Sequence, residues 1–257
     1  MIDTHAHIYS SKFDDDRDEV IARAFSNGIE YILMPNIDIE SIDPMLDVSA
    51  KYDKCIPMMG LHPCSVTDSY EDTLQSIKKE LFESKNRYIA VGEIGIDLYW
   101  DKTFLNQQIE AFRIQVKWAK ELSLPIVIHA RDSFCELLNI LDEDNDERLK
   151  GVFHCFSGSQ EEASHILSYG GFKLGIGGTV TYKKSGLPNV LKGIDLSHII
   201  IETDAPYLAP RPYRGKRNEC IYLKHVVEKL ADIYGCSANH IVENTSRNAK
   251  FLFNIKD

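Results

Sequence analysis

The chain begins with Met1-Ile-Asp-Thr-His-Ala-His7, a short apolar start that leads into two closely spaced histidines. We interpret Met1–Thr4 as the first buried strand of a sheet. In an open, doubly wound sheet the first strand is expected to run into a glycine-rich turn, and residues 3–7 contain no glycine. The beginning of the chain therefore favours a closed barrel over an open sheet.

Short apolar runs alternate with longer amphipathic stretches along the chain. This alternation predicts parallel strands with helices outside them, and eight such units in 257 residues are typical of a (β/α)8 (TIM) barrel, here one domain over residues 1–257. The predicted strands are Met1–Thr4, Tyr31–Met34, Ile56–Leu61, Ile89–Glu93, Ile126–His129, Val152–His154, Phe172–Ile176 and Ile199–Glu202. The predicted helices are Asp18–Phe25, Ile42–Lys51, Leu74–Phe82, Phe104–Leu122, Phe134–Leu141, Glu161–Leu167, Gly186–Lys192, Tyr222–Ile233 and Ala238–Phe251.

Composition indicates an ordinary folded protein, with 44 % hydrophobic and 26 % charged residues. A net charge of -10 argues against non-specific coating of nucleic acid, because phosphate is repelled at long range, but it leaves a local binding site possible. The six cysteines form no C-x-x-C pair and are expected to be reduced thiols. With no visible signal peptide and no apolar run of about 18 residues, we expect a cytoplasmic protein outside membranes.

Polar side chains that suit metal ions recur where the predicted strands end. They follow the first, third and eighth strands and terminate the fourth, fifth and sixth. Because all strands of a barrel end at one face, where this fold builds its active sites, these side chains are predicted to converge. The residues are His5, His7, His62, Glu93, His129, His154 and Asp204.

Imidazoles and carboxylates in this combination suit divalent ions such as Zn²⁺ and Mn²⁺. Residues two apart on a strand point to the same side, so His5 and His7 are predicted to reach one ion, and Glu93 to bridge it to a second. Two ions about 3.5–4 Å apart can clamp the attacking and leaving oxygens of a phosphodiester. Taken singly, such a histidine is more often structural, and Asp97 or Asp204 could merely cap a helix or turn; the joint placement is what favours a metal site.

The motifs that carry these residues resemble the TatD family of metal-dependent deoxyribonucleases, within the amidohydrolase-like barrels. The resemblance covers nearly the whole chain, and its motifs occur in the family's order. They are DTHAH at 3–7, GLHP at 60–63, GEIGID at 92–97, IHAR at 128–131, HCFSG at 154–158, ETDAPYL at 202–208 and RGKRNE at 214–219.

The resemblance implies two divalent ions, Zn²⁺, Mg²⁺ or Mn²⁺, and roles for the matching residues around them. The implied ligands of the first ion are His5, His7 and Asp204. The implied ligands of the second are His129 and His154, with Glu93 bridging the two. Catalytic roles fall to Asp204, Glu93 and His62, and contacts near the substrate to Arg131 and Glu202.

A basic loop follows the last predicted strand. Residues 210–217 read PRPYRGKR and place four cations and a tyrosine there in an acidic chain. Guanidinium groups bind phosphate oxygens bidentately, so Arg214 and Arg217 are predicted to contact substrate; the alternative is a solvated loop paired with nearby carboxylates. The candidates for stacking on an unpaired base are Tyr99, Trp100, Tyr207 and Tyr213.

These features favour hydrolysis of DNA phosphodiester bonds. The family resemblance implies a 3′–5′ exonuclease, acting on single-stranded or frayed ends, and a monomer without an obligatory protein partner. The alternative is a metal-dependent acyl or amide hydrolase, such as an amidohydrolase or an aminoacyl-tRNA deacylase. An open groove with phosphate contacts would favour the nuclease, and a closed small-molecule pocket the acyl hydrolase.

Overall fold

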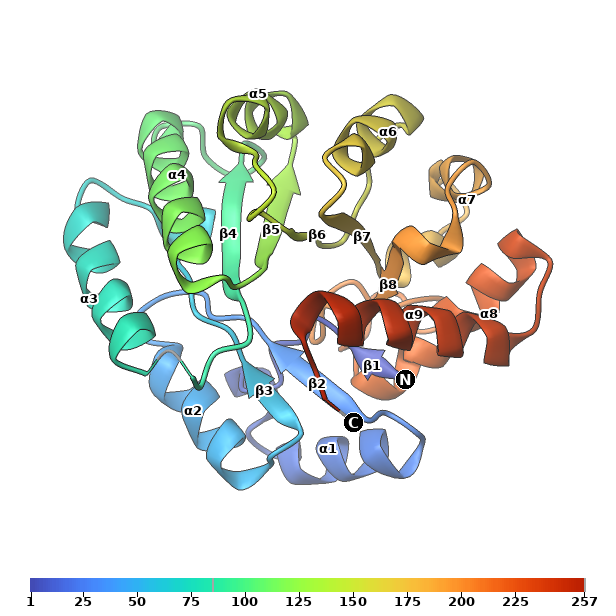
Figure 1. Ribbon diagram of the computed structural model, residues 1–257. Coiled ribbons are helices and arrows are strands. Elements are labelled where there is room, and N and C mark those ends of the chain that lie inside the picture. Colours follow the sequence, from blue (N-terminus) through green and yellow to red (C-terminus); the bar gives the residue numbers. More distant parts are fainter. Residues whose placement is uncertain (85, 257) are drawn as a thin grey trace.

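The computed structural model describes residues 1–84 and 86–256, and its parallel strands form a ring with the helices outside it (Figure 1). The predicted (β/α)8 barrel is thereby confirmed. The strands are β1 (Ile2–Asp3), β2 (Tyr31–Met34), β3 (Cys55–Pro57), β4 (Val91–Asp97), β5 (Ile126–Arg131), β6 (Gly151–Phe153), β7 (Phe172–Ile176) and β8 (Ile199–Ile201). The helices are α1 (Arg17–Ser26), α2 (Ile42–Lys51), α3 (Tyr70–Glu83), α4 (Leu105–Leu122), α5 (Phe134–Asp144), α6 (Gln160–Ser168), α7 (Leu187–Leu191), α8 (Leu223–Tyr234) and α9 (Ala238–Phe253).

The ring of strands is hydrogen-bonded in two arcs, β1-β2-β3 and β4-β5-β6-β7-β8. Single parallel bridges join the arcs, Met59 with Val91 on one side and Ala6 with Ala205 on the other. Next to the second bridge, the amide of Thr4 donates to the carbonyl of Ile201 at 3.2 Å. These contacts connect β3 to β4 and β8 to β1, so the sheet closes on itself.

The third strand is shorter than the sequence indicated. We expected it over Ile56–Leu61, and it is regular only over Cys55–Pro57. Proline has no amide hydrogen to donate, which interrupts the ladder at this point. The chain stays close to its neighbours afterwards, since the amide of Met58 donates to the carbonyl of Met34 at 2.8 Å.

The fourth strand was expected to end at Glu93, and it continues to Asp97. Its register against β5 shifts between Val91 and Ile94. At this irregularity the amide of Glu93 donates to the carbonyl of Asn36, just beyond β2, at 3.1 Å. Bulges of this kind occur next to active sites, where they redirect a side chain. Here the hydrogen bond connects Glu93 of β4 to the segment after β2, which is two strands away in the ring.

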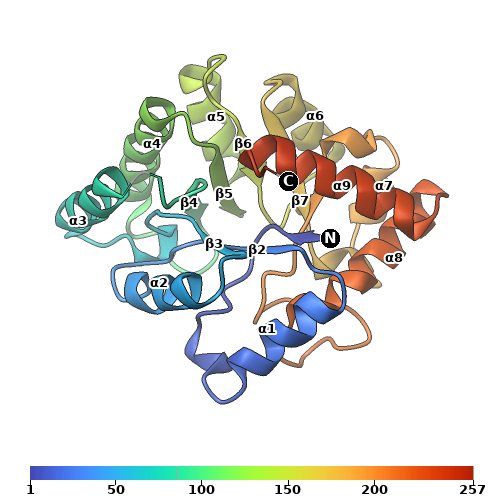
Figure 2. The same ribbon diagram turned by 60° about the horizontal axis from the view of Figure 1, so that its bottom comes forward.

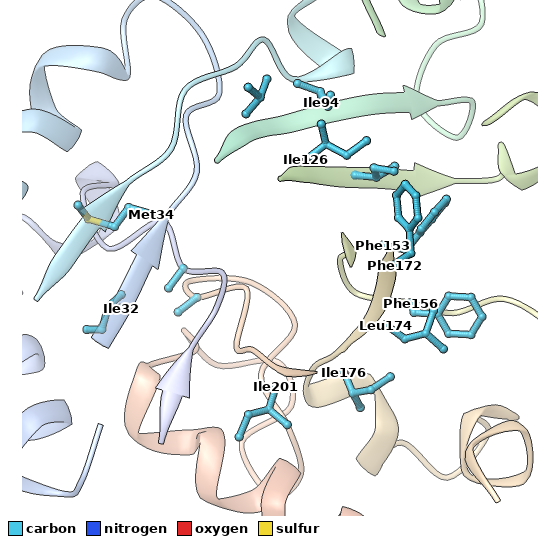
Figure 3. Close-up of a cluster of buried hydrophobic side chains, with 14 of the residues drawn as sticks. Ile32, Met34, Ile94, Ile126, Phe153, Phe156, Phe172, Leu174, Ile176 and Ile201 are labelled. Atoms are coloured by element: carbon cyan, nitrogen blue, oxygen red, sulfur yellow. The ribbon is translucent and has the colours of Figure 1, made fainter. Parts of the chain in front are cut away.

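Side chains alternate along the strands between two apolar layers. One layer packs under the outer helices and includes Ile126, Phe153 and Ile201 (Figure 3). The other includes Val127 and Ile200 and packs against Leu252 and Phe253 of α9, which lies across that end of the barrel (Figure 2). Polar side chains lie at the opposite end of the barrel, where the strands finish. Within the two described ranges, no helix combines the length and apolarity that a bilayer crossing needs.

Candidate metal centre

The alternation of side chains along the strands places apolar residues against α9 at one end of the barrel. The same alternation places polar side chains at the opposite end, where the strands finish. Val127 and Val152 pack toward α9, and the residues two positions later, His129 and His154, share their side of the strand. The same step leads from Ile200 to Glu202. The six predicted ligands and His62 meet at the C-terminal mouth of the barrel, where short contacts join the side chains of His5, His7, His62, Glu93, His129, His154 and Asp204.

A first group of ligand atoms comes from His5, His7, Glu93 and Asp204. His5 Nε2 lies 3.3 Å from His7 Nε2 and 3.1 Å from Glu93 Oε2. Asp204 Oδ1 lies 3.8 Å from His5 Nε2 and 3.5 Å from His7 Nε2. Two ligands bound to one Zn²⁺ at about 2.1 Å lie about 3.4 Å apart at the tetrahedral angle, so this spacing fits one ion.

A second group adjoins the first through the other oxygen of Glu93. Glu93 Oε1 lies 2.8 Å from His129 Nδ1 and 2.7 Å from His154 Nε2. The two imidazole nitrogens lie 3.3 Å apart. Three protein ligands leave coordination positions for water or substrate, as in catalytic zinc sites. Glu93 can therefore serve two neighbouring ions, one at each carboxylate oxygen.

Residues behind the ligands determine which ring nitrogen faces the centre. The hydroxyl of Tyr9 donates to the carbonyl of Pro35 at 2.5 Å, so it can accept from His7 Nδ1 at 2.9 Å. The proton then sits on Nδ1 of His7 and leaves Nε2 free for a metal. On His129, Nε2 lies 2.9 Å from Asp97 Oδ2, which leaves Nδ1 for the centre. Carboxylate–histidine pairs of this kind orient metal ligands.

Sequence reasoning undervalued two of these supporting residues. The sequence pattern offers Asp97 only as a possible cap of a helix or turn, and it assigns no role to Tyr9. Asp97 lies four residues after Glu93 on β4, so the period-two rule would have placed it on the ligand side. Tyr9 lies two residues after His7 but in a turn, where that rule does not apply, and only the structure brings its hydroxyl to His7.

Glu202 was expected near the substrate, and the structure places it behind His154 instead. Its side chain is 1 % exposed, and Oε1 accepts the amide of Cys155 and lies 3.5 Å from His154 Nδ1. A Cβ on Gly175 would come within 2.4 Å of Glu202 Oε2, so only glycine leaves room for this carboxylate. We therefore treat Glu202 as a residue that positions His154.

The centre carries ionised carboxylates. Burial by itself raises the pKa of Glu93, yet the facing imidazoles, His154 first, hold that pKa well below its usual range. Burial also opposes the charge of Asp97, but the hydrogen bond from His129 outweighs it and lowers the pKa to about 2. Burial opposes protonation of His154, and Glu93 reverses this and raises its pKa. Buried negative charge next to imidazole nitrogens is what a divalent cation requires.

The basic loop is only partly available to a substrate. Arg217 pairs with Asp16 at 2.6 Å and with Glu219 at 3.2 Å, so the guanidinium predicted to bind phosphate ties the loop to the residue before α1. These ion pairs engage the guanidinium of Arg217 within the protein, so Arg217 is not among the proposed substrate contacts. Arg214 is exposed and lies over the ring of Tyr182 at 4.6 Å.

A closed barrel with two adjoining ligand groups at its mouth is typical of a metal-dependent hydrolase, and the similarity to known proteins supports this class. A family model described as TatD related DNase matches residues 2–254. The uncharacterized metal-dependent hydrolase YabD of Bacillus subtilis is 39 % identical over 256 residues, 99 % of each chain. The 3′-5′ ssDNA/RNA exonuclease TatD of Cronobacter sakazakii is 33 % identical over 260 residues, 98 % of this chain and 97 % of that one. The crystal structure of YJJV, a TatD homologue from Escherichia coli K12, matches with a TM-score of 0.93 at 30 % identity, covering 100 % of this chain and 98 % of the other.

The chain belongs to the TatD family and is a metal-dependent hydrolase that acts on ester bonds. This membership confirms the resemblance found in its motifs.

Proposed function

We propose that this protein removes nucleotides from the 3′ ends of single-stranded DNA, with two divalent ions at the centre. The observation that carries the proposal is the placement of Glu93, whose Oε2 lies in the first ligand group and whose Oε1 lies in the second. The exonuclease activity named for the relative from Cronobacter sakazakii supports the choice of substrate. The ligand nitrogens favour Zn²⁺ by affinity, whereas Mg²⁺ or Mn²⁺ are alternatives for turnover.

The ions, when bound, would neutralise the phosphodiester and lower the pKa of water to roughly 7. Around them, Asp204 is the proposed proton acceptor. Its Oδ1 faces His5 and His7, which leaves Oδ2 to take a proton from the attacking water. Asp204 is held there in a left-handed conformation (φ 57°), and its amide donates to the carbonyl of His5 at 2.8 Å. Such a conformation in a non-glycine residue is a feature of functional sites.

His62 is the proposed hydrogen-bond donor to the phosphate or to the leaving oxygen. Its Nδ1 accepts the amide of Cys64 at 3.0 Å, so the neutral ring carries its proton on Nε2. Nε2 lies 3.3 Å from Glu93 Oε1 and thus points at the centre. A protonated nitrogen donates but does not ligate a metal, which sets His62 apart from the six ligands.

The substrate is proposed to approach over His62, His129 and Asp204. Their side chains are 14 %, 15 % and 12 % exposed, whereas those of His5 and Glu93 are 0 % and 2 % exposed. The other buried ligands lie beneath this edge. Arg131, at the end of β5, and the exposed Arg214 are the proposed phosphate contacts, because guanidinium groups pair with phosphate oxygens.

The test is degradation of single-stranded DNA labelled at its 5′ end, with Zn²⁺, Mg²⁺ or Mn²⁺ added. We expect loss of nucleotides from the 3′ end. The variants Glu93→Gln and His129→Ala should lose about 100-fold or more of this rate, beyond the 10- to 100-fold typical of a residue behind a ligand. His240→Ala, a histidine on the surface of α9, is the matched control and should be unaffected. Absence of cleavage with every ion, together with hydrolysis of an aminoacyl or amide substrate, would establish the alternative function.

A further inference from the structure

Large apolar side chains are exposed mainly around the mouth of the barrel. Within the described ranges, Tyr99 and Trp100 follow β4 and are 55 % and 70 % exposed, while Tyr207 follows β8 and is 41 % exposed. Leu208 and Ile39 also lie in loops after strands. Such a gathering of exposed apolar surface marks a binding site.

Tyr99 and Trp100 form an aromatic pair that contacts a cation and is hydrogen-bonded to a residue of the metal centre. The guanidinium of Arg131 lies 3.8 Å from the ring centre of Tyr99 and 5.2 Å from that of Trp100, and the two rings meet edge to face at 88°. Asp97 Oδ1 accepts the amides of both aromatic residues, at 2.9 and 3.2 Å. The same carboxylate accepts from His129 through Oδ2, so one side chain positions both a ligand and the aromatic pair.

A second aromatic residue with a cation lies across the mouth. The amino group of Lys12 is 4.3 Å from the ring centre of Tyr207, and that ring lies 6.0 Å from the ring of His7. Three strands separate β4 from β8 in either direction around the ring, which puts them on opposite sides of an eight-stranded barrel. Tyr207 therefore follows a strand on the side of the barrel opposite the one that carries Tyr99 and Trp100.

We propose that these two surfaces stack on unpaired nucleobases on either side of the scissile phosphate. The first surface consists of Tyr99, Trp100 and Arg131, and the second of Tyr207 and Lys12. Every base has a π-face, so stacking binds single strands regardless of sequence. Within a duplex the faces of a base are covered by its stacked neighbours. This inference rests on the proposed nuclease function and explains why the substrate would be single-stranded.

The structure also selects among the four aromatic candidates. The ring of Tyr213 is stacked on Tyr222, with 4.0 Å between ring centres and 4° between planes, so one of its faces is taken. Tyr99 and Tyr207 are exposed, whereas Tyr213 is half-buried. Cations beside the exposed rings strengthen base stacking and attract phosphate in a chain with a net charge of -10.

The test measures coupling between each surface and one base. The probe is a short single strand with phosphorothioate linkages, which resist hydrolysis, prepared complete or lacking the base at the last or the next-to-last 3′ position. Its affinity for the metal-loaded protein is measured by fluorescence anisotropy. The double variant Tyr99→Ala/Trp100→Ala should weaken binding of the complete strand about tenfold or more. If a strand already lacks the base that contacts Tyr99 and Trp100, the double variant should weaken its binding little further. Tyr207→Ala should weaken binding of the complete strand in the same way, but should have little effect on the strand that lacks the base at the other 3′ position.

Phe251→Ala is the control, because Phe251 is 81 % exposed on α9, away from the mouth. Equal weakening of complete and base-free strands, or none, would overturn the proposal. In the unmodified protein the complete strand should quench the fluorescence of Trp100, since Trp118 is 5 % exposed; unchanged fluorescence at saturation would also overturn it. Cleavage of ordinary DNA is assayed separately. Cleavage without base coupling rejects only the stacking surfaces, and base coupling without cleavage rejects only the nuclease function.

Discussion

Single residues behind the ligands determine the chemistry of this centre. A histidine can offer either ring nitrogen to a metal, and the partner of the other nitrogen decides which one. Tyr9 holds the proton of His7 on Nδ1, and Asp97 holds that of His129 on Nε2. The two histidines therefore present different nitrogens to neighbouring ligand groups.

Asp97→Asn should weaken metal binding about 10- to 100-fold. The asparagine can keep one oxygen for the amides of Tyr99 and Trp100, but it then turns its NH₂ toward His129. His129 must then accept at Nε2 and carry its proton on Nδ1, the nitrogen that faces the centre. Competition with a coloured chelator measures the affinity. Asp101→Asn, an exposed carboxylate in the same loop, is the control, and equal affinities for the two variants would contradict this role.

Among the elements, α9 has a structural task at the end of the barrel away from the ligands. Its residues Leu252 and Phe253 pack on Val127, Val152 and Ile200 from three different strands. The barrel needs this cover because its strands place apolar side chains at that end and polar ones at the other.

Leu252→Ala should lower the free energy of unfolding by about 2–5 kcal/mol, because Leu252 is 2 % exposed and its loss leaves a cavity. Chemical denaturation measures the change. Its neighbour Phe251 is 81 % exposed, and Phe251→Ala should change the value by no more than about 0.5 kcal/mol. Similar losses in both variants would mean that α9 does not close the barrel in this way.

For the whole molecule, metal binding and folding are coupled. The six proposed ligands come from segments at five strands, β1, β4, β5, β6 and β8, and only the closed barrel brings them together. An ion that binds the folded state alone stabilises it by about 2.7 kcal/mol at 100 times its Kd.

A chelator should therefore lower the Tm of the protein, and Zn²⁺ or Mn²⁺ should restore it. Differential scanning calorimetry of the metal-free and metal-loaded protein measures the shift. Glu93→Gln should show a much smaller rise on metal addition, because it removes a charge shared by both ligand groups. The same Tm with and without metal would exclude a tightly bound ion in the folded state.

Local patterns in the chain were enough to predict the barrel and the seven polar residues at its mouth. Apolar runs of strand length stand between helical stretches, and His5, His7, His129 and His154 lie at strand ends that a closed sheet must bring together. The limits of β3 and β4 were predicted incorrectly, because Pro57 and the register shift before Ile94 act through neighbouring strands.

Tertiary structure alone decided how the remaining residues are used. Arg217 and Arg214 look alike in the loop sequence, yet Asp16 lies beside Arg217, and these two residues are far apart in the chain. Glu202 is buried behind His154 because Gly175, on another strand, leaves it room. Tyr99 and Tyr207 oppose each other only because the ring closes. The partner, the burial and the orientation of a side chain depend on contacts between segments that are distant in the chain. The spacing of residues along the sequence does not specify those contacts.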